Sequence, residues 1–146
     1  MNTPFPPPRH ARFGGFALMM LLLLGCNSEP GRASIEGLVS LDGQPRSGIE
    51  VTFWNENDHQ QMVFSTTTGD DGRFLVENIF LGSVRECVVT FSKPALKNGS
   101  DIPPDIKASE VATIDLAPKS LRDPDKSPVH ASVPVSDFQY DIVTNQ

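Results

Sequence analysis

The sequence predicts an all-β fold: a single antiparallel β-sandwich of about seven strands, preceded by an N-terminal signal peptide. Three observations support this fold class. From residue 35 onward, apolar side chains recur with a period of two in short segments. Turn-forming residues separate these segments at spacings of about 8–12 residues. After the signal peptide, no stretch of about 12 residues keeps apolar groups at helical spacing without a glycine or proline.

The first two strands are expected on either side of a turn. Over residues 35–41 apolar and polar side chains alternate, which predicts a half-buried strand. Gly37 lies on its apolar face, where a glycine allows a neighbouring strand or an aromatic ring to approach closely. Asp42-Gly43 then turns the chain, and residues 49–54 form the second strand. Residues 55–61 are all polar, so we expect a loop there.

Three further strands are expected before residue 93. Residues 62–68 are rich in β-branched side chains, which favour strands. Asp71-Gly72 predicts a hairpin turn into the fourth strand, because this pair readily adopts positive φ. A turn at Gly82 leads into a fifth strand over residues 85–92. The inward-facing positions of these strands supply the expected core: Val51, Phe53, Phe74, Val89 and Phe91.

The rest of the chain is rich in proline. Seven prolines fall between residues 93 and 134, and proline removes a hydrogen-bond donor from a sheet, so most of this stretch is expected to be irregular. Residues 110–116 are the exception, a candidate short strand. Phe138, Tyr140 and Ile142 alternate with polar residues and predict the final strand.

The amino terminus has the pattern of a secretory signal. Arg9 and Arg12 lie in a segment without acidic residues, and residues 13–24 contain only Phe, Gly, Ala, Leu and Met. A helix of that length would span about 18 Å, well short of the roughly 30 Å of a bilayer core. We therefore expect a signal peptide over residues 1–25 rather than a membrane span.

Leu23-Leu24-Gly25-Cys26 resembles the lipobox of bacterial lipoproteins. The resemblance implies cleavage between Gly25 and Cys26 and a membrane anchor of covalent lipid, diacylglycerol and a fatty acid such as palmitate, on Cys26. Asn27 after the cysteine favours the outer membrane over the inner membrane of the cell envelope. The alternative is an ordinary signal peptide with an incidental cysteine, but no A-x-A-like cleavage site lies nearby.

Charge and composition predict how the mature domain is held. Loss of residues 1–25 removes Arg9 and Arg12 and changes the formal net charge from −6 to −8. An acidic domain lacks the basic face that nucleic-acid binding needs, and anionic headgroups repel it, so we expect it to stand away from the membrane. Residues 26–34 are short and polar and are expected to be a flexible tether. The β-sandwich is expected over residues 35–146.

Several motifs in order resemble the carboxypeptidase regulatory-like (transthyretin-like) domain, an immunoglobulin-like β-sandwich. They are Ile35-x-Gly37-x-Val39 with Asp42-Gly43-x-Pro45, Gly48-Ile49-x-Val51-x-Phe53, Thr68-x-x-Asp71-Gly72-x-Phe74, and Leu81-Gly82. Val84 stands where this family usually has a tyrosine. A later motif, Pro118-x-x-x-Arg122-Asp123-Pro124-x-x-Ser127-Pro128, is similar to the tail of small planctomycete-type lipoproteins that carry this domain. In the carboxypeptidases this domain is non-catalytic, so the resemblance implies a module without catalysis.

Residues of types that can take part in catalysis or metal binding have simpler structural interpretations here. His59 and His130 are isolated and form no zinc motif, and His59 is expected in a solvated loop. Ser127 has a histidine three residues later, but nothing marks an oxyanion hole. Cys87 alternates with core residues and is expected to be a buried thiol. Two acidic pairs, Asp70-Asp71 and Asp123-x-Asp125, offer too few oxygens to bind calcium. We therefore expect no metal and no cofactor.

Taken together, these observations predict an envelope-anchored lipoprotein that acts as a non-catalytic binding or structural module. Its expected contacts are the membrane, through lipid on Cys26, and an envelope protein or glycan that the sequence does not identify. One alternative is a carbohydrate-binding or adhesion module in which Trp54 stacks on a sugar. The other is a small transthyretin-like hydrolase, although the sequence lacks the His/Arg-rich motifs of those enzymes.

Overall fold

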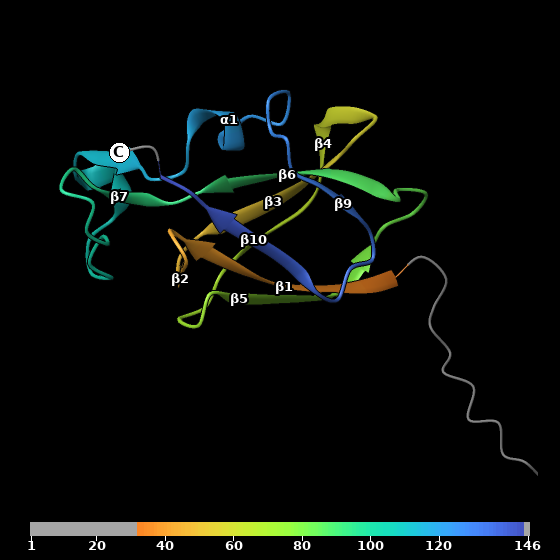
Figure 1. Cartoon of the computed structure of the whole chain (residues 1–146), viewed down its shortest axis with the longest axis horizontal. Helices are drawn as coiled ribbons and strands as arrows, with labels where there is room; N and C mark the ends of the chain where they lie inside the picture. Colours follow the sequence, from red (N-terminus) through yellow and green to blue (C-terminus); the bar gives the residue numbers. More distant parts are fainter. Residues whose placement is uncertain (1–31, 145–146) are drawn as a thin grey trace, which may run out of the picture.

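The structure, a computed structural model, describes residues 32–144 and confirms the all-β sandwich (Figure 1). Two four-stranded sheets pack against each other, and a small two-stranded sheet lies beside them. The elements in chain order are β1 (Arg32–Leu41), β2 (Gln44–Pro45), β3 (Glu50–Asn55), β4 (Asp58–Thr67), β5 (Arg73–Phe80), β6 (Glu86–Ser92), β7 (Pro94–Leu96), the 3-10 helix η1 (Ala108–Glu110), β8 (Thr113–Asp115), α1 (Lys119–Arg122), β9 (His130–Ser132) and β10 (Phe138–Ile142).

The first sheet is built around β1. On one edge, β1 pairs antiparallel with β5 and, at its C-terminal end, with β2. On the other edge it pairs with β10, and this pair is parallel, with Gly37 opposite Phe138. The expectation of antiparallel pairing therefore fails for this one pair. A parallel pair cannot be joined by a hairpin, and here all the elements from β2 to β9 lie between the two strands in the sequence.

β1 begins earlier than the sequence predicts. Its first residue is Arg32, so residues 32–34 belong to the sheet and not to the tether. Arg32 lies opposite Phe80 and Ala33 lies opposite Ile79, which shows that the end of β5 holds these residues in place. The polar character of this segment reflects exposure at the sheet end and not a lack of structure.

The second sheet has the order β4-β3-β6-β9. The prediction of a polar loop over residues 55–61 is wrong, because β4 already begins at Asp58 and a tight turn joins it to β3. The Asn55 side chain stabilises this turn: its Oδ1 accepts the N–H of Asn57, and its Nδ2 donates to Gln61. β4 is an edge strand, and its polar residues face solvent while their backbone stays paired.

The proline-rich stretch consists of short elements fastened to the sandwich. Asp115 is a main fastening point: Oδ1 accepts the backbone N–H groups of Lys93 and Ala117, and Oδ2 accepts the hydroxyl of Ser92. The strand expected over residues 110–116 is present in its centre as β8, which pairs with β7. The sequence did not predict β9. This strand is three residues long, lies between two prolines in the sequence, and pairs with the edge of β6.

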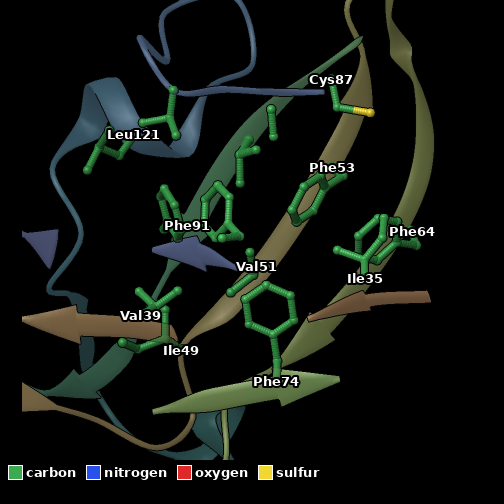
Figure 2. Close-up of a cluster of buried hydrophobic side chains, with 14 of the residues drawn as sticks. Ile35, Val39, Ile49, Val51, Phe53, Phe64, Phe74, Cys87, Phe91 and Leu121 are labelled. Atoms are coloured by element: carbon green, nitrogen blue, oxygen red, sulfur yellow. The ribbon is translucent and has the colours of Figure 1, made fainter. Parts of the chain in front are cut away.

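The core lies between the two main sheets and is rich in aromatic rings (Figure 2). Phe53 stacks on Phe64 with ring centroids 4.4 Å apart, and Phe91 stacks on Tyr140 at 4.9 Å. All five residues expected in the core are buried: Val51, Phe53, Phe74, Val89 and Phe91. On the opposite face of β6, Val88 and Thr90 are buried as well, and Thr90 accepts a hydrogen bond from the indole of Trp54 there.

The expected turn residues adopt the backbone conformations that their sequence predicts. Gly43, Gly72 and Gly82 all have positive φ, at 77°, 73° and 55°. Asp42, with φ of 52°, and Gly43 form the two-residue connection between β1 and β2, a pattern typical of type I′ hairpins. Asp71 accepts the N–H of Arg73 through Oδ1, which supports the turn before β5.

Candidate functional site

Gly25 and Cys26, the residues predicted to be cleaved and lipidated, lie outside the described residues. Over residues 32–144, no helix is long and apolar enough to cross a bilayer. The candidate sites that the structure can place are therefore those on the sandwich itself.

His59 lies on β4 rather than in a solvated loop, and it joins two parts of the chain that are distant in sequence. Its Nδ1 is 2.7 Å from Oδ1 of Asp125, in the loop that follows α1. The ring is partly buried, whereas the carboxylate is 77% exposed. This contact fastens the edge strand to the proline-rich segment. Sequence analysis did not predict it, because 66 residues separate the partners.

Asp123 lies in the same loop and already has partners. Its Oδ2 contacts Nζ of Lys126 at 2.5 Å, and its Oδ1 accepts the N–H of Asp125. The hydrogen bond from Lys126, followed by the one from Asp125, lowers the pKa of the Asp123 carboxyl group. Within residues 32–144, no group of three or more His, Cys, Asp or Glu residues is arranged to hold a metal ion.

Ser127 and His130 have separate structural roles. The hydroxyl of Ser127 is buried and donates to the carbonyl oxygen of Val89 at 2.5 Å, which ties the chain after α1 to β6. His130 is exposed on β9, and its Nδ1 lies 3.3 Å from Oε1 of Glu56. The hydroxyl is thus used in packing, and the histidine contacts an acid on a different element.

The aromatic side chains gather inside the molecule rather than on one open face. Trp54 is partly buried on the outer face of the second sheet, and its Nε1 donates to Oγ1 of Thr90 at 2.8 Å. This hydrogen bond holds the indole ring against β6. Among the aromatic rings of the described residues, Phe80 is the exception, with 73% of its surface exposed.

Cys87 is a fully buried free cysteine at the beginning of β6. Burial raises the pKa of its thiol to about 11, and the nearby carboxylates of Glu86 and Glu56 add to this effect. A thiol with so high a pKa is almost entirely protonated at neutral pH and is a poor nucleophile. The expected role as a small apolar core residue fits this environment.

A cavity of about 460 Å³ lies near the C-terminal end of β1, between the turn at Asp42 and the β7–β8 sheet. Its polar groups contact other parts of the protein. Both carboxylate oxygens of Asp42 accept hydrogen bonds from Thr144, and Arg46 pairs with Asp101 at 3.3 Å. The cavity therefore lies among groups that fasten the C-terminal strand and the proline-rich segment.

Beside the opposite end of β1, the last residue of β5 has the most exposed large apolar side chain within residues 32–144. Phe80 forms one wall of a cavity of about 260 Å³ between the edges of β4 and β5, and Met62, which is 54% exposed, lines it too. Sequence analysis did not select Phe80 as a candidate. The available signal was the run Ile79-Phe80-Leu81, because three consecutive apolar residues cannot all face the core of a strand with a period of two.

Comparison with known proteins provides no relative: no family model, no curated protein and no solved structure matches this chain. The likeness to carboxypeptidase regulatory-like domains and to planctomycete-type lipoproteins thus remains a prediction from the sequence motifs.

Proposed function

We propose that this protein is a lipoprotein of the bacterial cell envelope and that its sandwich is a non-catalytic binding or structural module. The observation that carries the proposal is Leu23-Leu24-Gly25-Cys26, which stands at the end of an uninterrupted apolar run that follows a basic segment. Such a run is too short to span a bilayer, and the small Gly25 suits a cleavage site.

The environments of the reactive side chains support a role without catalysis. The hydroxyl of Ser127 is buried against the carbonyl oxygen of Val89, and the thiol of Cys87 has a raised pKa. A catalytic nucleophile needs the reverse, namely exposure to substrate and an adjacent base. Asp123 and His59 form contacts that hold loops in place.

Mass spectrometry of the mature amino terminus, purified from the native host, tests this function. We expect a chain that begins at Cys26 and carries acyl groups. Cys26→Ser should abolish acylation and leave the protein uncleaved or released from the membrane. Cys87→Ala is the matched control, because its thiol is buried in the sandwich; it should leave acylation and membrane fractionation unchanged. A mature chain that begins at another, unmodified residue would overturn the proposal.

A further inference from the structure

The length of chain between the proposed anchor and the sandwich limits where the domain can lie. β1 begins at Arg32, so only residues 27–31 separate its first residue from Cys26. Even fully extended, the six steps from Cys26 to Arg32 reach at most about 22 Å. The start of β1 is thus held close to whatever surface anchors Cys26.

Phe80 lies at that same end of the molecule. It is directly opposite Arg32 in the β1–β5 pair, and neighbouring strands in a sheet lie about 4.8 Å apart. Its ring is 73% exposed and forms one wall of the cavity that Met62 and Val84 also line. An exposed aromatic ring therefore stands beside the point where the tether enters the sandwich.

Charge differs between the two ends of β1. Arg32 and Arg85 lie near Phe80, and Arg85 contacts the carbonyl oxygens of Gly82 and Val84 in the loop after β5. Glu86 is close by, and its carboxylate accepts the hydroxyl of Ser132. At the far end, four carboxylates lie around the first turn and the turn before β5, and two arginines lie among them: Asp42, Asp70, Asp71 and Asp141, with Arg46 after β2 and Arg73, whose Nε is 3.8 Å from Oδ2 of Asp71.

The two ends are far enough apart for these differences to orient the domain. A ten-residue strand is about 33 Å long, and Figure 1 shows the start of β1 at one end of the molecule, with β2 and β7 toward the other. The anionic headgroups of a bilayer repel the carboxylates at the far end, whereas at the near end Arg32 and Arg85 offset the charges of Glu77 and Glu86.

We propose that the surface formed by Phe80, Met62, Arg32 and Arg85, hereafter the Phe80 surface, docks on the bilayer that anchors Cys26. This inference rests on the proposed lipoprotein function. The ring of Phe80 lies at the boundary of headgroups and acyl chains, where amphipathic surfaces bind, and the two arginines lie at the level of the headgroups. The end with the four carboxylates then points away from the membrane. The earlier expectation that the acidic domain stands away from the membrane therefore applies to that end alone.

A single exposed ring binds a membrane weakly, and the anchor makes this weak contact effective. A short tether converts docking into an intramolecular step, with an effective concentration in the millimolar range. The surface therefore needs little affinity of its own. A free domain without the lipid is not expected to bind vesicles measurably.

Depth-dependent quenching of tryptophan fluorescence tests the proposal. Trp54 is the one tryptophan in the sequence, so Trp54→Phe gives the full acylated chain a dark background. Phe80→Trp then reports on the Phe80 surface, and Val143→Trp is the matched control, since Val143 is 63% exposed next to the end of β10. Both proteins are reconstituted in vesicles of phosphatidylglycerol and phosphatidylcholine brominated on the acyl chains. Circular dichroism verifies that each variant is folded.

We expect brominated lipid to quench about half or more of the fluorescence at position 80 and less than about a tenth at position 143. If Cys26 is acylated and both positions are quenched equally weakly, the docking inference is wrong while the lipoprotein function stands. The same holds if position 143 is quenched more strongly than position 80. If mass spectrometry finds no acyl group on Cys26, the lipoprotein function fails, and the docking inference fails with it.

Discussion

The ring of Phe74 fills the space that a side chain at residue 37 would need. A Cβ atom on Gly37 would lie 2.8 Å from both Cε1 and Cζ of Phe74 and 2.6 Å from the carbonyl oxygen of Phe138. Gly37 lies opposite Phe74 on one edge of β1 and opposite Phe138 on the other. The glycine thus allows three adjacent strands and a buried ring to pack at one point of the first sheet.

Gly37→Ala should therefore destabilise the protein. The new methyl group would overlap the ring and a backbone oxygen, and the oxygen cannot move without disturbing the parallel β1–β10 pair. We expect a loss of about 1–3 kcal/mol in the free energy of unfolding, measured by urea denaturation. Gly69→Ala is the control, since its Cβ would find no atom closer than 3.5 Å. Equal stabilities for the two variants would contradict this packing.

Phe74→Ala tests the register of β5. The ring is 4% exposed and lies near the rings of Phe53 and Phe138, so its removal leaves a cavity in the core. We expect a loss of about 3–5 kcal/mol. Leu75→Ala, one residue further along, changes a side chain that is 57% exposed and should cost less than about 0.5 kcal/mol. Reversed effects would place β5 one residue out of register.

The sequence was sufficient to predict features that depend on local pattern. Alternation with a period of two located the inward faces of β3, β5 and β6. Turn chemistry identified Gly43 and Gly72, because positive φ is easy only for glycine. The close approach at Gly37 also followed from the absence of a side chain on an apolar strand face.

Features that depend on contacts between distant segments could not be predicted from local pattern. The parallel pairing of β10 with β1 and the addition of β9 to β6 join residues far apart in the sequence. Polar residues at an edge strand resemble a loop, which is why the start of β4 was missed. The contact of His59 with Asp125 could not be predicted for the same two reasons. It depends on His59 lying on β4, and it depends on the loop after α1 returning to that strand from 66 residues away.

Cys87 should be almost unreactive in the folded protein. With a pKa of about 11, roughly one thiol in a thousand is ionised at pH 8, and the sulfur is also buried. In the Cys26→Ser variant, where Cys87 is the remaining cysteine, iodoacetamide at pH 8 should label the native protein at least about 100-fold more slowly than the urea-unfolded protein. Comparable rates would show that the beginning of β6 is open to solvent.

The ion pair between Lys93 and Asp101 should make stability depend on pH. Nζ of Lys93, a residue only 6% exposed, lies 2.7 Å from Oδ1 of Asp101. The hydrogen bond from this lysine lowers the pKa of Asp101 below its usual value of 3.8. A carboxyl group with a lowered pKa in the folded state stabilises the protein above the unfolded-state pKa. That stabilisation disappears as the pH falls through the folded-state pKa.

Asp101→Asn should accordingly be less stable than the wild type at pH 6, and the difference should shrink below about pH 4. The Asp101 side chain is 52% exposed, so solvent screens the pair, and we expect a loss of about 1 kcal/mol at pH 6. Asp105→Asn, an exposed carboxylate in the same segment, is the control and should leave stability unchanged. Urea denaturation of all three proteins from pH 3 to pH 7 measures the effect. A constant difference between Asp101→Asn and the wild type across this range would show that ionisation of Asp101 does not stabilise the fold.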